Sequence, residues 1–73
     1  MRQNLKEARQ KAGMTQQQMA DRLEISLRYY QNIEAGSRTG DFGIWDALED
    51  ITGIHQRTLR EISKTRPVQG DSQ

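Results

Sequence analysis

The sequence predicts an all-α domain, a compact bundle of about five short helices. Two observations carry this prediction. Apolar residues recur at helical spacing instead of alternating as they do in strands, and only one proline and six glycines interrupt the 73 residues. The length predicts one domain with a small core. Because the chain has no cysteine, disulfides and thiolate metal sites cannot support that core.

The first helix is predicted over residues 4–12. Leu5, Ala8 and Ala12 follow one another at helical spacing and therefore share one face. Gly13 comes next, and a glycine at this position can adopt the positive φ that ends a helix. We therefore expect a short amphipathic helix with all three apolar residues directed inward.

The second helix is predicted to begin after Thr15. This threonine and Gln18 form the T-x-x-Q pattern of a capping box, in which each side chain bonds to the backbone of the other residue. The helix must end near Leu23 or Glu24, because Ser26 is typical of a new N-cap. Its buried face is predicted to hold three apolar residues, Met19, Ala20 and Leu23.

The third helix is predicted over residues 27–35, between the N-cap Ser26 and the closing Gly36. Tyr30 and Ile33 are spaced to anchor its inner side. The outward side and its flanks hold Leu27, Arg28, Tyr29, Gln31 and Asn32. Most of these side chains form hydrogen bonds and none is acidic, which is unusual in a chain that contains ten Asp and Glu residues.

A loop over residues 36–41 is predicted to lead into the fourth helix, which Asp41 can cap and Gly53 can end. Its inward positions are predicted to be Trp45, Leu48 and either Ile51 or Thr52. A short fifth helix over residues 56–62 would contribute Leu59 and Ile62. We expect the domain to span residues 1–62, and residues 63–73, with one apolar residue, to form a disordered tail.

Composition narrows the classes of function. The longest apolar runs span only two or three residues, which excludes a membrane span and a signal peptide and leads us to expect a cytoplasmic protein. Residues 1–39 hold seven basic and four acidic side chains, whereas residues 40–62 hold two basic and five acidic ones. This asymmetry favours a polyanion as the partner of the N-terminal half, although such a split also arises by chance in small proteins.

The second and third predicted helices, joined by a short turn, have the arrangement of a helix-turn-helix. Ala20 is small enough for the third helix to cross closely, and Ile25 in the turn can fill the core. The outward side of the third helix could then enter the major groove of DNA, where Arg pairs with guanine and Asn or Gln with adenine. The alternative is a solvated helix face that happens to be polar.

Residues 5–36, "LKEARQKAGMTQQQMADRLEISLRYYQNIEAG", resemble the lambda-repressor-like helix-turn-helix family of phage repressors, Cro proteins and bacterial regulators. The specific parts are "TQ" at the start of the second helix, Ala20, and "IEAG" at the end of the third. The resemblance extends more loosely over residues 37–62. It implies a bundle of about five helices that binds pseudo-palindromic double-stranded DNA, usually as a homodimer.

The resemblance also implies individual roles. Gln16 would contact a phosphate, helped by the helix N-terminus beside it, and Leu27, Arg28 and Asn32 would read bases. Ser26 and Arg38 would contact the DNA backbone on either side of the recognition helix. From their chemistry alone, Gln31 could pair with adenine and Tyr29 could contact a phosphate or sugar. Arg9 and Glu34 would form an ion pair between the first helix and the end of the third.

Three positions depart from the family pattern. Glu24 stands where the turn usually has glycine, so a left-handed backbone there would cost about 1 kcal/mol or more. Tyr30 replaces an aliphatic residue, so its hydroxyl requires a partner or an exit to solvent. Glu49 stands where a small apolar residue is typical, which concerns the packing of the fourth helix.

These observations predict a sequence-specific DNA-binding transcriptional regulator, a repressor that binds its operator as a dimer through residues 27–35. We expect neither catalysis, a cofactor nor a metal, because His55 is the only histidine and no catalytic or ligand cluster accompanies it. The alternative is an antitoxin or another module that uses the same fold to bind a protein partner. An exposed Trp45 would favour that alternative, since exposed tryptophans often anchor interfaces.

Overall fold

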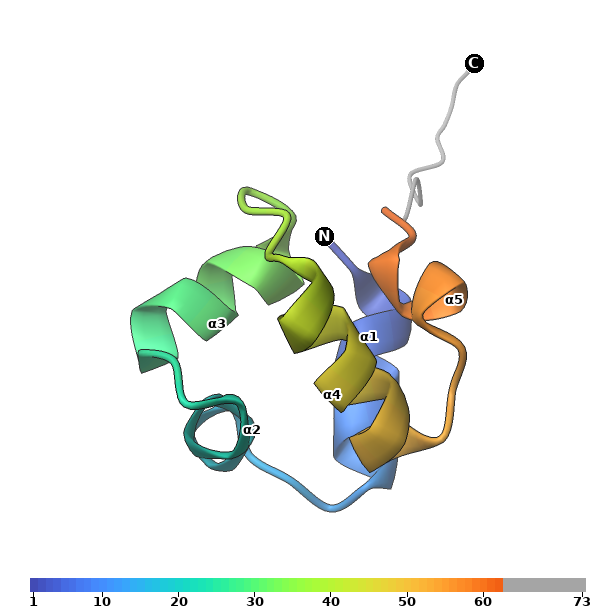
Figure 1. Cartoon of the computed structure of the whole chain (residues 1–73), viewed down its shortest axis with the longest axis horizontal. Coiled ribbons are helices and arrows are strands. Elements are labelled where there is room, and N and C mark those ends of the chain that lie inside the picture. The colour runs from blue at the N-terminus through green and yellow to red at the C-terminus, as the bar shows by residue number, and fades with distance from the viewer. Residues whose placement is uncertain (63–73) are drawn as a thin grey trace.

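The computed structural model describes residues 1–62, which form five helices and no strand (Figure 1). The helices are α1 (Gln3–Lys11), α2 (Gln16–Leu23), α3 (Leu27–Ala35), α4 (Phe42–Thr52) and α5 (Gln56–Arg60). The all-helical bundle is therefore confirmed. The predicted tail, residues 63–73, lies outside the described residues. Within residues 1–62, no helix is both long and apolar enough to span a bilayer.

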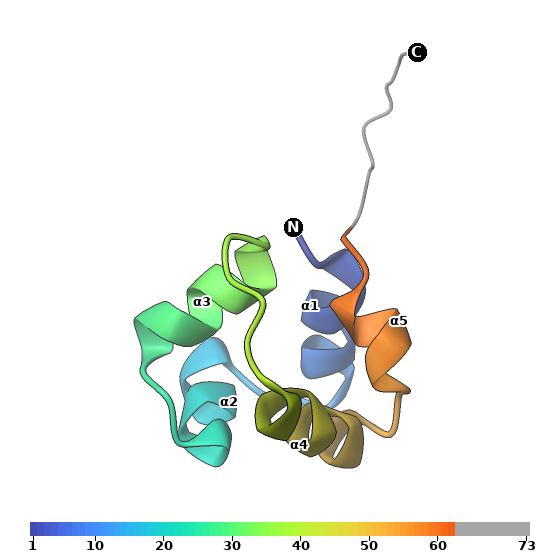
Figure 2. The same cartoon turned by 45° about the horizontal axis from the view of Figure 1, so that its top comes forward.

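The helices enclose one core. α2 packs on α3 and α1 packs on α5, while α4 contacts both α2 and α5 and so joins the two pairs. Figure 2 shows α4 at the bottom of the bundle, beside α2 and below α1 and α5. Ten buried residues from all five helices make up this core: Leu5, Ala8, Met19, Ala20, Tyr30, Ile33, Ile44, Trp45, Leu48 and Leu59. The predicted anchors of α3, Tyr30 and Ile33, are both among them.

The ends of the middle helices follow from local chemistry. Thr15 and Gln18 form the predicted capping box at the start of α2. The Ser26 hydroxyl accepts a hydrogen bond from the Tyr29 amide at 3.0 Å, and the Asp41 carboxylate accepts one from the Ile44 amide at 3.0 Å. Each cap satisfies a backbone N–H that the first turn of a helix leaves unpaired, so α2, α3 and α4 begin where the sequence predicts.

The predicted first helix was placed one residue too late at both ends, and Ala12 is exposed instead of buried. The helix ends at Lys11, and Ala12 serves as its C-cap before Gly13 turns the chain at φ 73°. Ala12 therefore lies where the chain already leaves α1. The third buried residue of α1 is Arg9, which the sequence analysis expected in an ion pair with Glu34 and not among the apolar inward residues.

The predicted fifth helix was too long. α5 ends at Arg60, because Glu61 adopts φ −58° and ψ 130°, which is extended backbone. Ile62 therefore leaves the helical register of Leu59 and is 45 % exposed, contrary to the prediction. In α4, Ile44 joins Trp45 and Leu48 in the core although the sequence analysis did not select it.

Candidate nucleic-acid interface

The two sides of α3 have opposite surroundings. Tyr30 and Ile33 are fully buried on the inner side. Arg28 and Gln31 are exposed and Asn32 is half-buried on the outer side. Since the anchors face the core and the remaining polar side chains face away from it, the outer side is open to a ligand.

Five of the predicted DNA-contacting residues line one open hollow of about 410 Å³: Ser26, Arg28, Tyr29, Asn32 and Arg38. The hollow contains two arginines and no acidic residue. Within the described chain, the side chains of Arg28, Asn32 and Arg38 form no hydrogen bond or ion pair. Their donors are therefore free to bind a ligand in the hollow.

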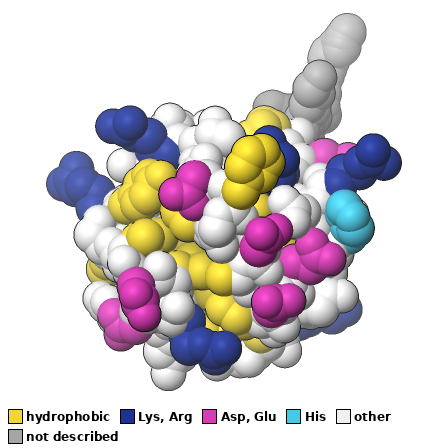
Figure 3. All heavy atoms as spheres, in the orientation of Figure 1, with side chains coloured by type: hydrophobic (Ala, Val, Ile, Leu, Met, Phe, Trp, Pro, Cys, Tyr) yellow, Lys and Arg dark blue, Asp and Glu magenta, His cyan; other side chains and the backbone are white. Residues whose placement is uncertain are grey.

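The charges of the molecule are separated in space. Asp46, Glu49 and Asp50 belong to α4, and Figure 3 shows acidic side chains gathered over that helix. The arginines of the hollow belong to α3 and to the segment that follows it. An anionic ligand would therefore meet attraction at α3 and repulsion at α4.

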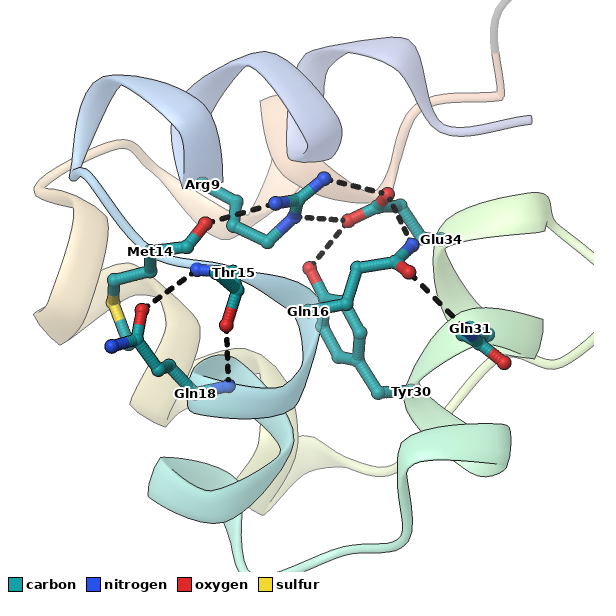
Figure 4. Close-up of polar contacts among 8 residues, drawn as sticks. All are labelled: Arg9, Met14, Thr15, Gln16, Gln18, Tyr30, Gln31 and Glu34. Atoms are coloured by element: carbon teal, nitrogen blue, oxygen red, sulfur yellow. Dashed lines mark hydrogen bonds and ion pairs between the residues drawn. The ribbon is translucent and has the colours of Figure 1, made fainter.

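A buried polar cluster holds the inner side of α3 (Figure 4). Arg9 Nε donates to Glu34 Oε2 at 2.9 Å, and Arg9 Nη2 donates to Glu34 Oε1 at 3.3 Å. The Tyr30 hydroxyl donates to Glu34 Oε2 at 2.7 Å. The predicted Arg9–Glu34 pair therefore exists, and it also supplies the partner that the Tyr30 hydroxyl requires. Arg9 additionally donates to the Met14 carbonyl at 2.9 Å, which ties the segment between α1 and α2 to this cluster.

Glu34 is 2 % exposed, yet its hydrogen bonds keep it ionised. Burial alone would raise the pKa of Glu34, but hydrogen bonds from Arg9, Tyr30 and Gln16 outweigh it and hold that pKa below its usual value. Burial and the bond to Glu34 raise the pKa of Tyr30. Tyr30 thus remains a neutral donor and Glu34 a charged acceptor, which is the combination that the cluster requires.

Gln16 connects this cluster to the outer side of α3. Its Nε2 donates to Glu34 Oε1 at 3.0 Å, and its Oε1 accepts from Gln31 Nε2 at 3.2 Å. Each of these amide nitrogens carries a second hydrogen. Gln16 and Gln31 are therefore held in fixed positions while each keeps a donor for another partner.

The turn before α3 is strained as the sequence predicts. Glu24 adopts φ 59° and ψ 42°, and it is the only described non-glycine residue with positive φ. Ile25 in this turn and Leu27 at the start of α3 are both half-buried. The left-handed Glu24 ends α2 only two residues before Ser26 caps α3, so this conformation makes the short turn between the two helices possible.

Trp45 lies in the core, 1 % exposed, with its Nε1 donating to the Thr39 carbonyl at 2.7 Å. The exposed tryptophan that would favour a protein-partner module is therefore not present. Glu49 is half-buried, and its Oε1 accepts from Gln56 Nε2 at 3.1 Å, which ties α4 to α5.

Sequence reasoning missed two residues. Arg2 is buried and contacts the end of α3, whereas an arginine next to a chain terminus usually indicates a surface cation. Phe42 is 79 % exposed at the first position of α4, although an aromatic residue in a small domain is expected in the core. No periodicity could have identified either residue, because both lie at the edge of a helix.

Comparison with known proteins agrees with this geometry. A helix-turn-helix family model matches residues 5–55, which include α2, the turn and α3. Searches of curated proteins and of solved structures returned no significant match. The family assignment therefore rests on more than half of the chain, and it includes the residues that line the hollow.

Proposed function

Since this chain belongs to the Cro/CI-type helix-turn-helix family of DNA-binding regulators, we propose that it represses transcription by inserting α3 into the major groove of a pseudo-palindromic operator. The observation that carries the proposal is the hollow beside α3, in which Arg28, Asn32 and Arg38 present donors that no described residue uses. A polyanion with readable base edges suits such a surface better than any apolar ligand.

Four side chains of α3 would read bases. Arg28 has the planar fork that binds O6 and N7 of guanine, and Asn32 has the amide that binds N6 and N7 of adenine. Leu27, half-buried at the start of α3, can contact a thymine methyl group. Gln31 keeps one amide hydrogen and its oxygen for the same groove, since its other hydrogen bonds Gln16. These residues would give the protein its sequence preference.

The surrounding residues would bind the phosphate backbone. Gln16 lies at the first position of α2, where its second amide hydrogen and the free N–H groups of the helix start can meet one phosphate. Ser26, Tyr29 and Arg38 line the hollow and can contact phosphates next to the bases that α3 reads. These contacts would orient α3 without selecting a sequence.

Exposed apolar side chains support binding as a dimer. Phe42 lies at the start of α4, beside a second hollow of about 320 Å³ that Trp45 and Arg60 also line. Met1 and Ile62 are the other large hydrophobic residues exposed within residues 1–62. If two copies bury Phe42 against each other, two α3 helices can enter grooves about 34 Å apart. One phenylalanine per copy contributes about 2 kcal/mol, so we propose a dimer that is weak in solution and stable on DNA.

Selection of bound sequences from a random DNA pool tests the proposal. We expect enrichment of a two-fold symmetric motif by the wild type and none by a variant with both Arg28→Ala and Asn32→Ala. No enrichment by the folded wild type would contradict the proposed function. An asymmetric motif of one half-site would contradict the dimer alone.

Changing the exposed phenylalanine separates dimer contacts from base contacts. Phe42→Ser should weaken binding to the symmetric site but leave binding to a single half-site unchanged, because Phe42 is absent from the hollow beside α3. Equal losses on both DNAs would show that Phe42 contacts DNA and not a second copy.

A further inference from the structure

We propose that Arg2 positions the recognition unit by fixing the C-terminal end of α3 and the backbone that carries Arg38. The inference rests on the proposed DNA binding through α3. Arg2 lies before the matched residues 5–55, so the family assignment gives it no role. It makes no contribution to the hollow beside α3 and would act only through other residues.

The guanidinium of Arg2 joins three separate parts of the chain. Nη1 donates to the carbonyl of Ile33 at 2.6 Å and to that of Arg38 at 2.8 Å, while Nε donates to that of Arg60 at 2.9 Å. The backbone N–H of Arg2 donates to the Glu34 carbonyl at 2.7 Å. The start of the chain therefore bonds to the last turn of α3, to the segment after it and to the end of α5.

The charge of Arg2 is buried without an acidic partner. The residue is 5 % exposed, and the only ion pair within the described residues joins Arg9 and Glu34. Burial, followed by the nearby Arg60, lowers the pKa of Arg2. The carbonyls at two helix ends carry partial negative charge, and the Trp45 ring lies 5.2 Å from Cζ of Arg2. Neutral groups thus take the place of a carboxylate.

This arrangement suits a clamp on helix ends. Carbonyls in the last turn of a helix have no partner inside that helix, and Arg2 provides one for Glu34 and Arg60. It adds a second donor to the Ile33 carbonyl, which also accepts from the Gly36 amide at 3.2 Å. An acid beside Arg2 would compete for its donors. Glu61 lines the same surface depression as Arg2 but forms no ion pair with it, so Nε and Nη1 of Arg2 donate to carbonyls alone.

The clamp matters for DNA because Arg38 projects from the clamped segment. The Arg38 side chain lines the hollow beside α3 and is exposed, while its carbonyl is held by Arg2. The inner side of α3 is fixed by Arg9 and its N-terminus by Ser26. Arg2 therefore completes the support of α3 and fixes the backbone from which Arg38 would reach a phosphate.

Salt dependence of DNA binding provides a test that a purely structural role would not affect. The slope of log K against log salt is negative, and each lost phosphate contact reduces its magnitude by about 0.9. We expect Arg38→Ala and Arg2→Met each to reduce the magnitude of the slope by about 0.9, and the double variant to show no further fall in that magnitude. Affinities are measured on the selected operator and corrected for the folded fraction of each variant.

Arg57→Met is the matched control. Arg57 lines the same surface depression as Arg2 but has no hydrogen bond to α3 or to the Arg38 segment. Arg57→Met removes the same charge as Arg2→Met but should keep the wild-type slope of log K against log salt. A fall equal to that of Arg2→Met would overturn the inference, because general charge loss would then explain both variants.

The inference is also overturned if folded Arg2→Met keeps the wild-type slope, or if its effect adds fully to that of Arg38→Ala. Should Arg2→Met not fold, the same set is measured in a Glu24→Gly background, where relief of the strained turn supports folding. A wild type that selects no DNA sequence would overturn the proposed function itself, which is a separate result from a failed slope test.

Discussion

The two sides of α3 carry similar side chains in opposite states. On the inner side, the Glu34 carboxylate accepts hydrogen bonds from Arg9, Tyr30 and Gln16. On the outer side, no residue of the described chain bonds the side chains of Arg28 and Asn32. A buried polar group must be paired because burial without a partner is costly, whereas an exposed one can remain unpaired until a ligand arrives. Polarity alone therefore does not identify a binding surface, but unused donors do.

Removing the charge of Glu34, on the inner side of α3, should have the largest effect on stability. Glu34→Gln leaves the buried Arg9 cation without a counterion and should lower the free energy of unfolding by about 3–5 kcal/mol. Denaturant titration followed by circular dichroism measures it. The matched control is Glu7→Gln on exposed α1 surface, which should change stability by less than about 0.5 kcal/mol. Equal effects of the two variants would show that the buried pair contributes nothing special.

Removing the Arg28 side chain, on the outer side of α3, should weaken DNA binding but leave the fold intact. Arg28→Ala should weaken binding to the selected operator by about 1–3 kcal/mol and relax the preference at one base position. Its stability should change by less than about 0.5 kcal/mol, because Arg28 has no partner within residues 1–62. Uniform weakening across all sequences would instead make Arg28 a phosphate contact.

Gln16 bonds Glu34 on the inner side of α3 and Gln31 on the outer side. Its replacement should therefore lower both stability and DNA binding, each by less than the changes at Glu34 and Arg28. Gln16→Ala removes a hydrogen bond to Glu34 and should cost about 1 kcal/mol of stability. It should also weaken binding to all DNA sequences alike, since its proposed contact is a phosphate. Competition gel shifts with matched and mismatched sites measure this, and a changed base preference would contradict the assigned role.

The inner side of α3 could be predicted closely from the sequence because its signals are local or shared by the family. Tyr30 and Ile33 are separated by a helical interval, and Ser26 and Gly36 mark the ends of the helix. The Arg9–Glu34 pair came from the resemblance. The additional donors on Glu34 could not be predicted, because they depend on how α2 crosses α3 and on the direction of the Tyr30 hydroxyl.

The wrong predictions of burial concern residues at the ends of helices. Ala12 and Ile62 both fit an apolar periodicity, but the backbone departs from the helix before the side chain reaches the core. Arg2 and Phe42 reverse the usual preference of their residue types for surface and core. Such positions are decided by contacts between distant segments, which a single sequence does not display.

The turn that leads into α3 offers a stabilising change that should leave both sides unaffected. Glu24→Gly should raise the free energy of unfolding by about 1 kcal/mol, because glycine adopts the left-handed conformation without steric cost. Glu24→Ala keeps the strain and serves as the control, so it should not stabilise. If both variants stabilise equally, removal of the charge and not the backbone is responsible.

Low pH should reduce the stability that the buried cluster on the inner side of α3 provides, because Glu34 takes up a proton. Because the folded-state pKa of Glu34 is lowered, the folded chain binds fewer protons there than the unfolded chain. This part of the stability is complete above the unfolded pKa of about 4.3 and is lost as pH falls through the lower folded value. The stability difference between wild type and Glu34→Gln, measured by urea titration, should therefore be constant at neutral pH and shrink below about pH 4. Other carboxylates are shared by both proteins and cancel. A difference that grows in acid would mean that burial outweighs the hydrogen bonds and that Glu34 takes up a proton more readily when folded.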